Sequence, residues 1–448
     1  MGVRERSAPA DRTGLAHPDR EIWRLALPAF LALVAEPLFL LADSAIVGHL
    51  GTAPLAGLGV AGVILQTVVG LCVFLAYGTT ASVARRIGAG DRRGALTQGI
   101  DGLWLAVAIG VVVTLPVLLA AEPLCRAVGA EGVVLDQATT YLRIGILGVT
   151  PLLLLLAGNG VLRGLQDTRT PLVVAVGGNL INIALNLLFV PVLGLGIAGS
   201  ALGSVIAQLA SAVALVAVVI RGAKRQGARL SPDLTGIKAA GRAALPLVVR
   251  TLTLRGSLLV TTYAVTVIPS GDAATHLAAH QVAFTLWTFL AFVLDAIAIA
   301  AQALTGRALG EGDRSLTRAL TTRMVWWGTW SGVALGLGLA ALSPFLGALF
   351  SSDPGVSDAL VPVLLVAALG QPICGVVFVL DGVLIGAGDG RYLARGGLLT
   401  LALYAPVVAL WHPGLVQIWI AFSFLFMGMR FAVLTARARG DRWMKVGA

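Results

Sequence analysis

The chain has 448 residues, of which 57% are apolar and only 12% are charged, and its mean hydropathy is +0.91. A water-soluble protein of this length needs charged residues over its whole exterior, so this composition excludes a soluble globular protein and indicates an integral membrane protein. The net charge of +10 could favour nucleic acid as a partner, but the distribution of the basic residues argues against it.

Twelve apolar stretches follow one another along the chain, and most approach the roughly 20 residues that a membrane-spanning helix needs. They comprise residues 25–47, 55–76, 103–121, 141–161, 171–190, 197–220, 245–268, 278–300, 324–346, 360–380, 398–410 and 415–434. The eleventh stretch is the shortest. Because the residues before the first stretch are polar and that stretch can itself span, we expect no cleavable signal. The predicted fold class is all-α integral membrane, with twelve transmembrane helices.

Nearly all of the 32 Lys and Arg residues lie at the termini or in alternate connections between the stretches. The connections around His49, Asp272 and His412 contain none. The exceptions to this alternation are Arg126, Arg143, Arg250 and Arg255. Cytoplasmic connections of membrane proteins carry such an excess, which predicts that both termini are cytoplasmic. The abundance of Arg, Ala and Gly suggests a GC-rich bacterial genome, and hence the bacterial cell membrane.

The sequence repeats itself at an offset of 222 residues. Gly88-Ala-Gly-Asp91-Arg92 recurs as Gly310-Glu-Gly-Asp313-Arg314, and Leu162-x-Gly164-x-x-Asp167 recurs as Leu384-x-Gly386-x-x-Asp389. Several matches at one offset indicate a duplication. Each copy holds six helices, an even number, so both copies have the same orientation and are related by an axis along the membrane normal. Two such bundles can rock about a central cleft, as alternating access requires.

This repeat divides the chain into five parts. We expect a cytoplasmic arm at residues 1–24, an amino-terminal lobe at 25–220, a cytoplasmic linker at 221–243, a carboxy-terminal lobe at 244–434 and a cytoplasmic tail at 435–448.

Charged and amide side chains inside the apolar stretches are candidate functional residues, because a charge in lipid is costly. Glu36 and Asp43 share one face of the first helix, since they are seven residues apart. The fifth helix has Asn179, Asn182 and Asn186 on one face, and the second half contributes Arg250, Arg255, Asp295, Gln302 and Asp381. We expect these faces to line a water-filled cavity or a helix interface.

Among these residues, Asp43 is the acid most suited to couple proton entry to substrate exit. A carboxylate in a partly desolvated pocket can exchange protons in the physiological range, and its charge then depends on the proton load. The alternative is that Asp43 only pairs with a neighbour. Arg250 and Arg255 are interpreted as fixed partners of Asp295, Asp381 or Glu36 rather than as substrate ligands. For Asp295 and Asp381, structural and functional roles remain equally open.

No motif indicates an enzyme, a cofactor or a metal. Gly194-Leu-Gly196-Ile-Ala-Gly199 fits GxGxxG, but it lies between two apolar stretches instead of following a strand, so we interpret it as a tight turn. Cys72, Cys125 and Cys374 are isolated, which predicts neither a disulfide framework nor a metal site. In the absence of a P-loop, the expected driving force is a proton or sodium gradient.

Several motifs resemble the multidrug and toxic compound extrusion (MATE) family. They are Asp43-Ser-Ala-Ile-Val-Gly48, Gly88-x-Gly-Asp and Leu162-Arg-Gly164-x-x-Asp167-Thr. Ala279-His-Gln281 and Leu380-Asp381-Gly382-Val-Leu-Ile-Gly386 further resemble its DNA-damage-inducible (DinF-like) branch. The resemblance extends from Ala26 to the twelfth helix. It implies two six-helix lobes around a central cavity, and export of organic compounds driven by a proton or sodium gradient.

The resemblance also implies roles for individual residues. Asp43 corresponds to the acid that couples transport to the cation, with Glu36 as a possible companion, while Tyr141, Asn182 and Asn186 correspond to positions of the amino-lobe pocket. The remaining residues expected to line the cavity are Asn179, Gln281, Asp295, Gln302 and Asp381. The chain departs from some relatives, which carry an acid in place of Asn186, and from many in the branch, which carry Glu in place of Gln302.

These observations predict a monomeric antiporter in the lipid bilayer that exports amphipathic, often cationic organic compounds. One alternative is a lipid-linked oligosaccharide flippase, whose cavity should be cationic; here Arg250 and Arg255 are outnumbered by Glu36, Asp43, Asp295 and Asp381. The other alternative is a non-transporting membrane scaffold. It would be expected to carry a sizeable soluble domain, and no connection is long enough to form one.

Overall fold

The computed structural model describes residues 18–268, 273–350, 353–411 and 414–447. Helices, turns and short connections account for all of these residues. The prediction of an all-α fold is confirmed.

The first half of the chain forms α1 to α9. The elements are α1 (Pro18–Gly48), α2 (Thr52–Leu71), α3 (Phe74–Gly88), α4 (Arg92–Leu119), α5 (Ala121–Ala127), α6 (Gly132–Gly145), the 3₁₀ turn η2 (Ile146–Gly148), α7 (Val149–Gly164), α8 (Arg169–Leu187), the π turn η3 (Leu188–Val192) and α9 (Gly196–Arg225).

The second half forms α10 to α16. The elements are α10 (Leu234–Thr266), α11 (Ala273–Gly310), α12 (Arg314–Phe350), α13 (Pro354–Gly386), α14 (Gly390–Leu410), α15 (Leu415–Ile420), the π turn η4 (Ala421–Phe426) and α16 (Met427–Arg439).

Twelve helical segments in the described part of the chain are long and apolar enough to cross a membrane, and each overlaps one predicted stretch. Most extend beyond the apolar stretch because their polar ends remain helical outside the lipid-sized core. α9 and α10 accordingly reach into the predicted linker and leave residues 226–233 between them. The eleventh segment, Gly390–Leu410, is the shortest, as expected. Helix α5, in the connection after α4, was not predicted.

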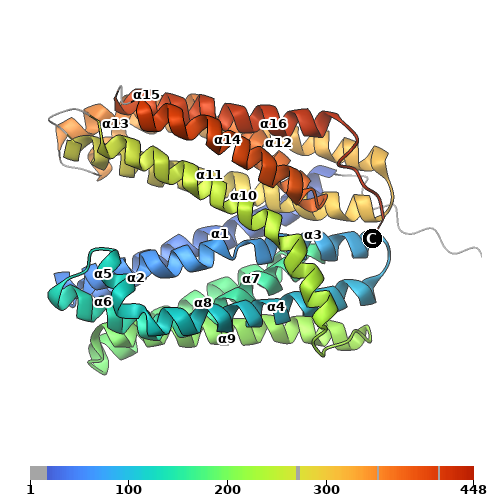
Figure 1. Ribbon diagram of the computed structural model, residues 1–448, viewed down its shortest axis with the longest axis horizontal. Helices are drawn as coiled ribbons and strands as arrows, with labels where there is room; N and C mark the ends of the chain where they lie inside the picture. Colours follow the sequence, from blue (N-terminus) through green and yellow to red (C-terminus); the bar gives the residue numbers. More distant parts are fainter. Residues whose placement is uncertain (1–17, 269–272, 351–352, 412–413, 448) are drawn as a thin grey trace, which may run out of the picture.

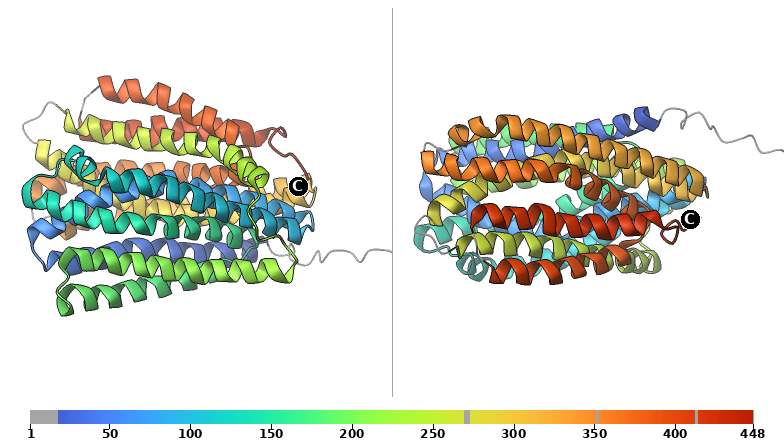
Figure 2. Two further views of the ribbon diagram at one scale, coloured as in Figure 1. Left: turned by 60° about the horizontal axis from the view of Figure 1, so that its bottom comes forward. Right: turned by 90° about the horizontal axis from the view of Figure 1, so that it is seen from above.

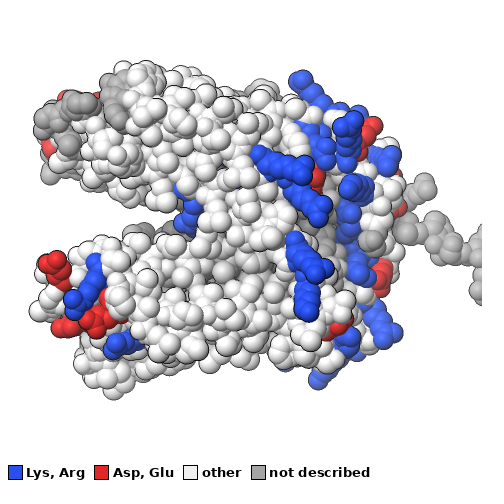
Figure 3. Space-filling view, in the orientation of Figure 1, with Lys and Arg blue, Asp and Glu red and all other residues white. Residues whose placement is uncertain are grey.

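The helices form two lobes that meet at one end and separate at the other (Figure 1). The lobe of α1–α9 lies below and the lobe of α10–α16 above, with α10 crossing in front of the junction; Figure 2 shows the same bundles from two other sides. The space-filling view shows a V-shaped groove between them, open at the end away from the C-terminus (Figure 3). Contacts between the lobes come mainly from α1, α3 and α4 on one side and α10, α11 and α13 on the other.

The repeated Gly-x-Gly-Asp motif forms matching turns in the two lobes. Gly90 and Gly312 adopt φ values of 78° and 81°, which favour glycine over residues with a Cβ. Asp91 then accepts a hydrogen bond from the Gly94 amide at 2.7 Å, and Asp313 accepts one from the Leu316 amide at 2.9 Å. These bonds satisfy free amides at the starts of α4 and α12. The Gly94 amide is also the main cause that lowers the pKa of Asp91.

The lobes touch closely where these turns begin. A Cβ atom added to Gly88 would lie 2.8 Å from the carbonyl carbon of Arg307, and one added to Gly310 would lie 2.8 Å from that of Arg85. Arg85 donates to the Ala387 carbonyl at 2.8 Å, and Arg307 donates to Oε1 of Gln166 at 2.8 Å. Helices α3 and α11 thus cross by equivalent contacts in both directions.

Lys and Arg gather at the end where the lobes meet, and acidic residues stand out at the open end (Figure 3). The C-terminus also lies at this basic end, where Trp443 and Met444 are buried and the Gly447 amide donates to the Leu309 carbonyl at 3.1 Å (Figure 1). The segment after α16 therefore packs against the end of α11.

Candidate functional site

Asp43 is buried near the C-terminal end of α1, with only 3% of its surface exposed. Its Oδ1 atom accepts hydrogen bonds from Ser200 Oγ of α9 at 2.6 Å and from Asn186 Nδ2 of α8 at 2.7 Å. The Tyr141 hydroxyl of α6 donates to Oδ2 at 3.4 Å. Four helices therefore position one carboxylate, and the predicted grouping of Asp43, Tyr141 and Asn186 is present.

A chain of amides continues from this carboxylate. Asn186 Nδ2 also donates to Asn182 Oδ1 at 3.0 Å, and Asn182 Nδ2 donates to Ser204 Oγ at 2.9 Å. Asn182 and Asn186 are buried between helices instead of lining an open cavity. Asn179 lies apart and half-buried, and its Nδ2 donates to the Ala35 carbonyl of α1 at 2.8 Å, which makes it a bridge between α8 and α1.

Every hydrogen-bond donor to Asp43 is a neutral group, and no described Lys, Arg or His lies within ion-pair distance of it. Asn186 Oδ1 is buried without a partner among the described residues. The Asn186 amide can therefore serve Asp43 in two ways, donating through nitrogen when the acid is ionised and offering a free acceptor when it is protonated. A proton arriving at Asp43 would remove an uncompensated charge.

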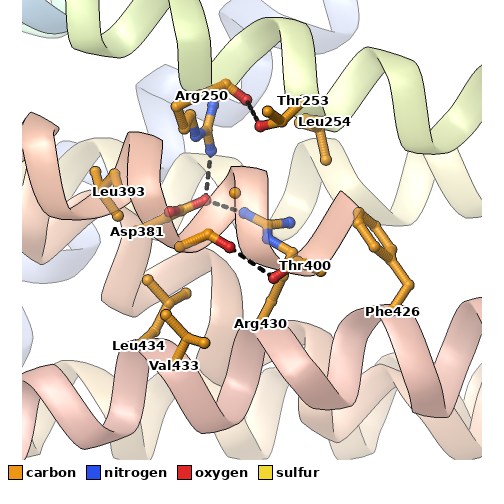
Figure 4. Close-up of a pocket in the computed structure, with 12 residues that line it drawn as sticks. Arg250, Thr253, Leu254, Asp381, Leu393, Thr400, Phe426, Arg430, Val433 and Leu434 are labelled. Atoms are coloured by element: carbon orange, nitrogen blue, oxygen red, sulfur yellow. Dashed lines mark hydrogen bonds and ion pairs between the residues drawn. The ribbon is translucent and has the colours of Figure 1, made fainter. Parts of the chain in front are cut away.

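Asp381 in the carboxy-terminal lobe differs from Asp43 because its partners are cationic. Asp381 of α13 pairs with both Arg250 of α10 and Arg430 of α16, and both guanidinium groups bind its Oδ2 atom (Figure 4). The three residues line a cavity of about 30 Å³, room for one or two water molecules. The expected pairing of Arg250 with an acid is present, whereas Arg430 was assigned from sequence to the cytoplasmic side. Its side chain is only 12% exposed.

A second small cavity lies at the junction of the lobes. It is lined by Tyr77 of α3, together with Arg250, Asp295, Gln302 and Asp381 of the other lobe. Gln302 is buried and its Nε2 donates to the Tyr77 carbonyl at 2.5 Å, so it joins α11 to α3.

Half-buried Asp295 forms no ion pair within 4.0 Å among the described residues. Arg163 and Arg250 are nevertheless the cations that interact electrostatically with its carboxylate. Arg163 lies in the last turn of α7, and the sequence analysis had counted it, like Arg430, with the cytoplasmic residues. The surroundings of Asp295 and Asp381 therefore hold more positive charge than predicted.

Arg255 does not have the acidic partner that the sequence analysis expected. It is exposed on α10, and no described residue forms an ion pair or hydrogen bond with its side chain. Its guanidinium group instead rests against Gly70 of α2, where an added Cβ would lie 2.8 Å from Cζ. The residue consequently spans the junction of the lobes.

Two other predicted residues do not join these clusters. Gln281 is exposed on α11, outside both cavities. Glu36 lies on α1, but its side chain falls outside the described residues, so its ion-coupling role stays a prediction. Sequence reasoning missed Ser200, Ser204 and Tyr77. Serines among Gly and Ala in an apolar helix look like packing residues, and only the rotation of α9 turns Ser200 toward Asp43.

No group of three or more metal-ligating side chains occurs in the described ranges. Cys72, Cys125 and Cys374 are buried free thiols. Gly194 and Gly196 adopt φ values of 64° and 56° in the turn before α9, which confirms the interpretation of the GxGxxG pattern as a tight turn.

Comparison with known proteins gives one consistent result. The MatE family model matches residues 28–188 and 246–411, one segment in each half. The chain is 31% identical over 439 residues to protein DETOXIFICATION 44, chloroplastic, of Arabidopsis thaliana, covering 93% of this chain and 81% of the relative. It is also 31% identical over 303 residues to DNA damage-inducible protein F of Escherichia coli, covering 67% and 66%.

The fold is similar to a solved outward-facing structure of a multidrug resistance MATE family transporter of the MOP superfamily. The TM-score is 0.85 at 22% identity, with 97% of this chain and 99% of the other covered.

Proposed function

Because this chain belongs to the MATE family of multidrug and toxin efflux transporters, we propose that it is a secondary antiporter that exports amphipathic organic compounds in exchange for protons. Members of this family are membrane transporters and not enzymes. Antiport, the coupling ion and the class of substrate are the parts of this proposal that go beyond the family assignment.

The observation that carries proton coupling is the environment of Asp43. Its carboxylate is buried, and only Ser200, Tyr141 and Asn186 donate to it. Because no cation compensates its charge, protonation changes the electrostatic free energy of this part of the lobe by a large amount. A conformational equilibrium that alters access to Asp43 must then depend on the proton load. Sodium remains the alternative ion, with the same carboxylate as its ligand.

The groove supports alternating access. It is open at one end and closed at the other, where α3 and α11 cross (Figures 1 and 3). Rocking of two pseudo-symmetric lobes would exchange these ends. If the basic end faces the cytoplasm, this arrangement supports the proposal of an outward-open state of a bacterial cell-membrane protein with both termini inside. We propose that the monomer is sufficient for transport.

A lipid-linked oligosaccharide flippase is the second candidate. A flippase needs a cationic cavity to bind pyrophosphate. Arg163 near Asp295 and Arg430 beside Asp381 add positive charge to this region, which favours that candidate. The exported compounds were expected from sequence to be often cationic. The unpaired Arg255 counts against that expectation.

Substrate efflux under separately imposed ion gradients tests the proposal. Inverted vesicles containing the full chain, whose cytoplasmic face is outside, would receive an amphipathic dye in the external medium. They would be given a proton gradient or a sodium gradient with the higher concentration in the lumen, and dye entry into the lumen would be followed. We expect the proton gradient alone to drive dye movement and Asp43→Asn to abolish it. Asp136→Asn, which alters an exposed acid of the same lobe, is the matched control and should behave like the parent. Full efflux by Asp43→Asn would overturn the proton-coupling role.

A further inference from the structure

We propose that Arg255 binds the anionic group, a carboxylate or a phosphate, of an amphipathic compound in the groove between the lobes. The proposal rests on the function proposed above and specifies the charge of its substrates.

The first observation is the place of Arg255 along α10. It lies about three turns before the end of the helix at Thr266, or roughly 16 Å from it at 1.5 Å per residue. This depth is well inside the apolar part of the bundle. An arginine there is costly unless it meets water or an anion. Arg255 is exposed, and no described acid pairs with it.

The second observation is the contact with Gly70. Because glycine lacks a Cβ, the guanidinium group can approach α2 of the other lobe closely. Arg255 is thereby held where α2 and α10 approach each other. Lys or Arg atoms are visible inside the closed end of the V-shaped groove (Figure 3). A ligand held at this point would contact both lobes.

The third observation is that no described acid pairs with Arg255. Asp381 is shared by Arg250 and Arg430, and Asp43 is buried beneath neutral donors. Half-buried Asp295 has Arg163 and Arg250 as the cations acting on it. The described charges at the junction therefore leave Arg255 as a cation without a counter-ion. Guanidinium groups bind carboxylates and phosphates through two parallel hydrogen bonds, which makes such anions the expected ligand.

The surroundings of Arg255 indicate an amphipathic ligand. Leu252, Leu259 and Tyr263 follow the spacing of one helical face and are 50%, 71% and 57% exposed. An anionic head at Arg255 would thus be flanked by apolar and aromatic surface. This chemistry is shared by free amphipathic anions and by lipids with a phosphate head.

Equilibrium binding to the purified full chain in detergent tests this assignment. The probes are carboxyfluorescein, an anion, and rhodamine 6G, a cation, read by fluorescence anisotropy. We expect Arg255→Gln to weaken carboxyfluorescein binding at least tenfold, Arg255→Lys to retain part of it, and rhodamine 6G binding not to weaken in either variant. Arg143→Gln, at an exposed arginine of α6, is the control for a general loss of positive charge and should match the parent.

Two outcomes would overturn the proposal. One is equal carboxyfluorescein affinity in Arg255→Gln and the parent, and the other is a parent that binds only the cation. Competition then identifies the source of the anion: displacement by polyprenyl phosphate but not by millimolar inorganic phosphate supports a lipid ligand, and displacement by both supports a free anion.

A second variant separates this proposal from the coupling role of Asp43. Asp43→Asn should bind carboxyfluorescein like the parent, because Asp43 is buried and its hydrogen bonds are to Ser200, Tyr141 and Asn186, none of which contacts Arg255. If Asp43→Asn loses proton-driven efflux but still binds carboxyfluorescein, both the coupling role of Asp43 and the anion site at Arg255 are supported. If Arg255→Gln binds carboxyfluorescein normally while Asp43→Asn loses efflux, the anion site is rejected and the coupling role is kept.

Discussion

Gly88 of α3 and Gly310 of α11 lie against each other's helix at the closed end of the groove, each in the place where the partner's backbone leaves no room for a Cβ. They are equivalent residues of the two repeats. The same glycine-to-backbone contact, made once by each repeat, therefore holds α3 and α11 together at the closed end.

Gly88→Ala should weaken this closure. The added methyl group would overlap the α11 backbone, so α3 and α11 must move apart at the basic end. Spin labels on cysteines placed at Arg92 and Arg314, both exposed, should report a longer mean distance, since the native thiols are buried. Gly78→Ala in the same helix has open space around its Cβ and serves as the control. An unchanged distance in Gly88→Ala would show that the crossing does not determine closure.

Ser200→Ala should reduce proton-driven efflux. The hydroxyl donates to Asp43 at 2.6 Å, and a hydrogen bond to a charged group contributes about 1.5–3 kcal/mol. We expect the initial efflux rate to fall roughly tenfold or more at a fixed gradient, as this loss of stabilisation implies. Ser257→Ala is matched, because that buried hydroxyl bonds only to the Thr253 carbonyl of its own helix. Equal rates in the two variants would exclude Ser200 from the coupling site.

Asp381→Asn should destabilise the carboxy-terminal lobe. The change leaves the buried Arg250 and Arg430 without their shared counter-ion, a loss of about 3–5 kcal/mol for a broken buried ion pair. The midpoint of thermal unfolding, followed by tryptophan fluorescence in detergent, should fall by several degrees. Asp389→Asn removes an acid paired with Arg437 alone and should have a smaller effect. Adding Arg430→Gln to Asp381→Asn should restore part of the loss.

Gln166→Gly should open the basic end without harming the turn that contains it. Gln166 has a φ of 62°, and its equivalent in the second repeat is Gly388 at 72°. Glycine would relieve about 1 kcal/mol of backbone strain but would remove the acceptor that Arg307 binds across the lobes. The same pair of spin labels should move apart while the thermal midpoint stays equal or rises. A lower midpoint with an unchanged distance would contradict this account.

The sequence allowed the twelve spanning helices to be predicted because lipid requires a long apolar run for each of them. It did not define their ends, since polar residues such as those at the start of α10 remain helical beyond the apolar region. The cluster of Asp43, Asn186 and Tyr141 was anticipated from one helical face and from family motifs. Ser200 was not, because its contact depends on how α9 rotates against α1.

Charge was the least predictable property. Arg163 and Arg430 lie near helix ends in the sequence, so counting by position assigned them to the cytoplasm. In the fold, Arg430 turns inward to Asp381, and Arg163 is placed near Asp295. The position of a residue along the chain gives its depth, but the direction in which its side chain points depends on helix packing.

The crowding of Lys and Arg at the closed end has a consequence for the membrane itself. Basic residues at a bilayer surface attract anionic headgroups by about 1 kcal/mol each, so this end should gather an annulus of acidic lipid (Figure 3). Under the proposed alternating access, those lipids would have to rearrange when α3 and α11 separate. The leaflet around the protein would then take part in the transport equilibrium, and reconstitution into purely zwitterionic vesicles would remove that contribution.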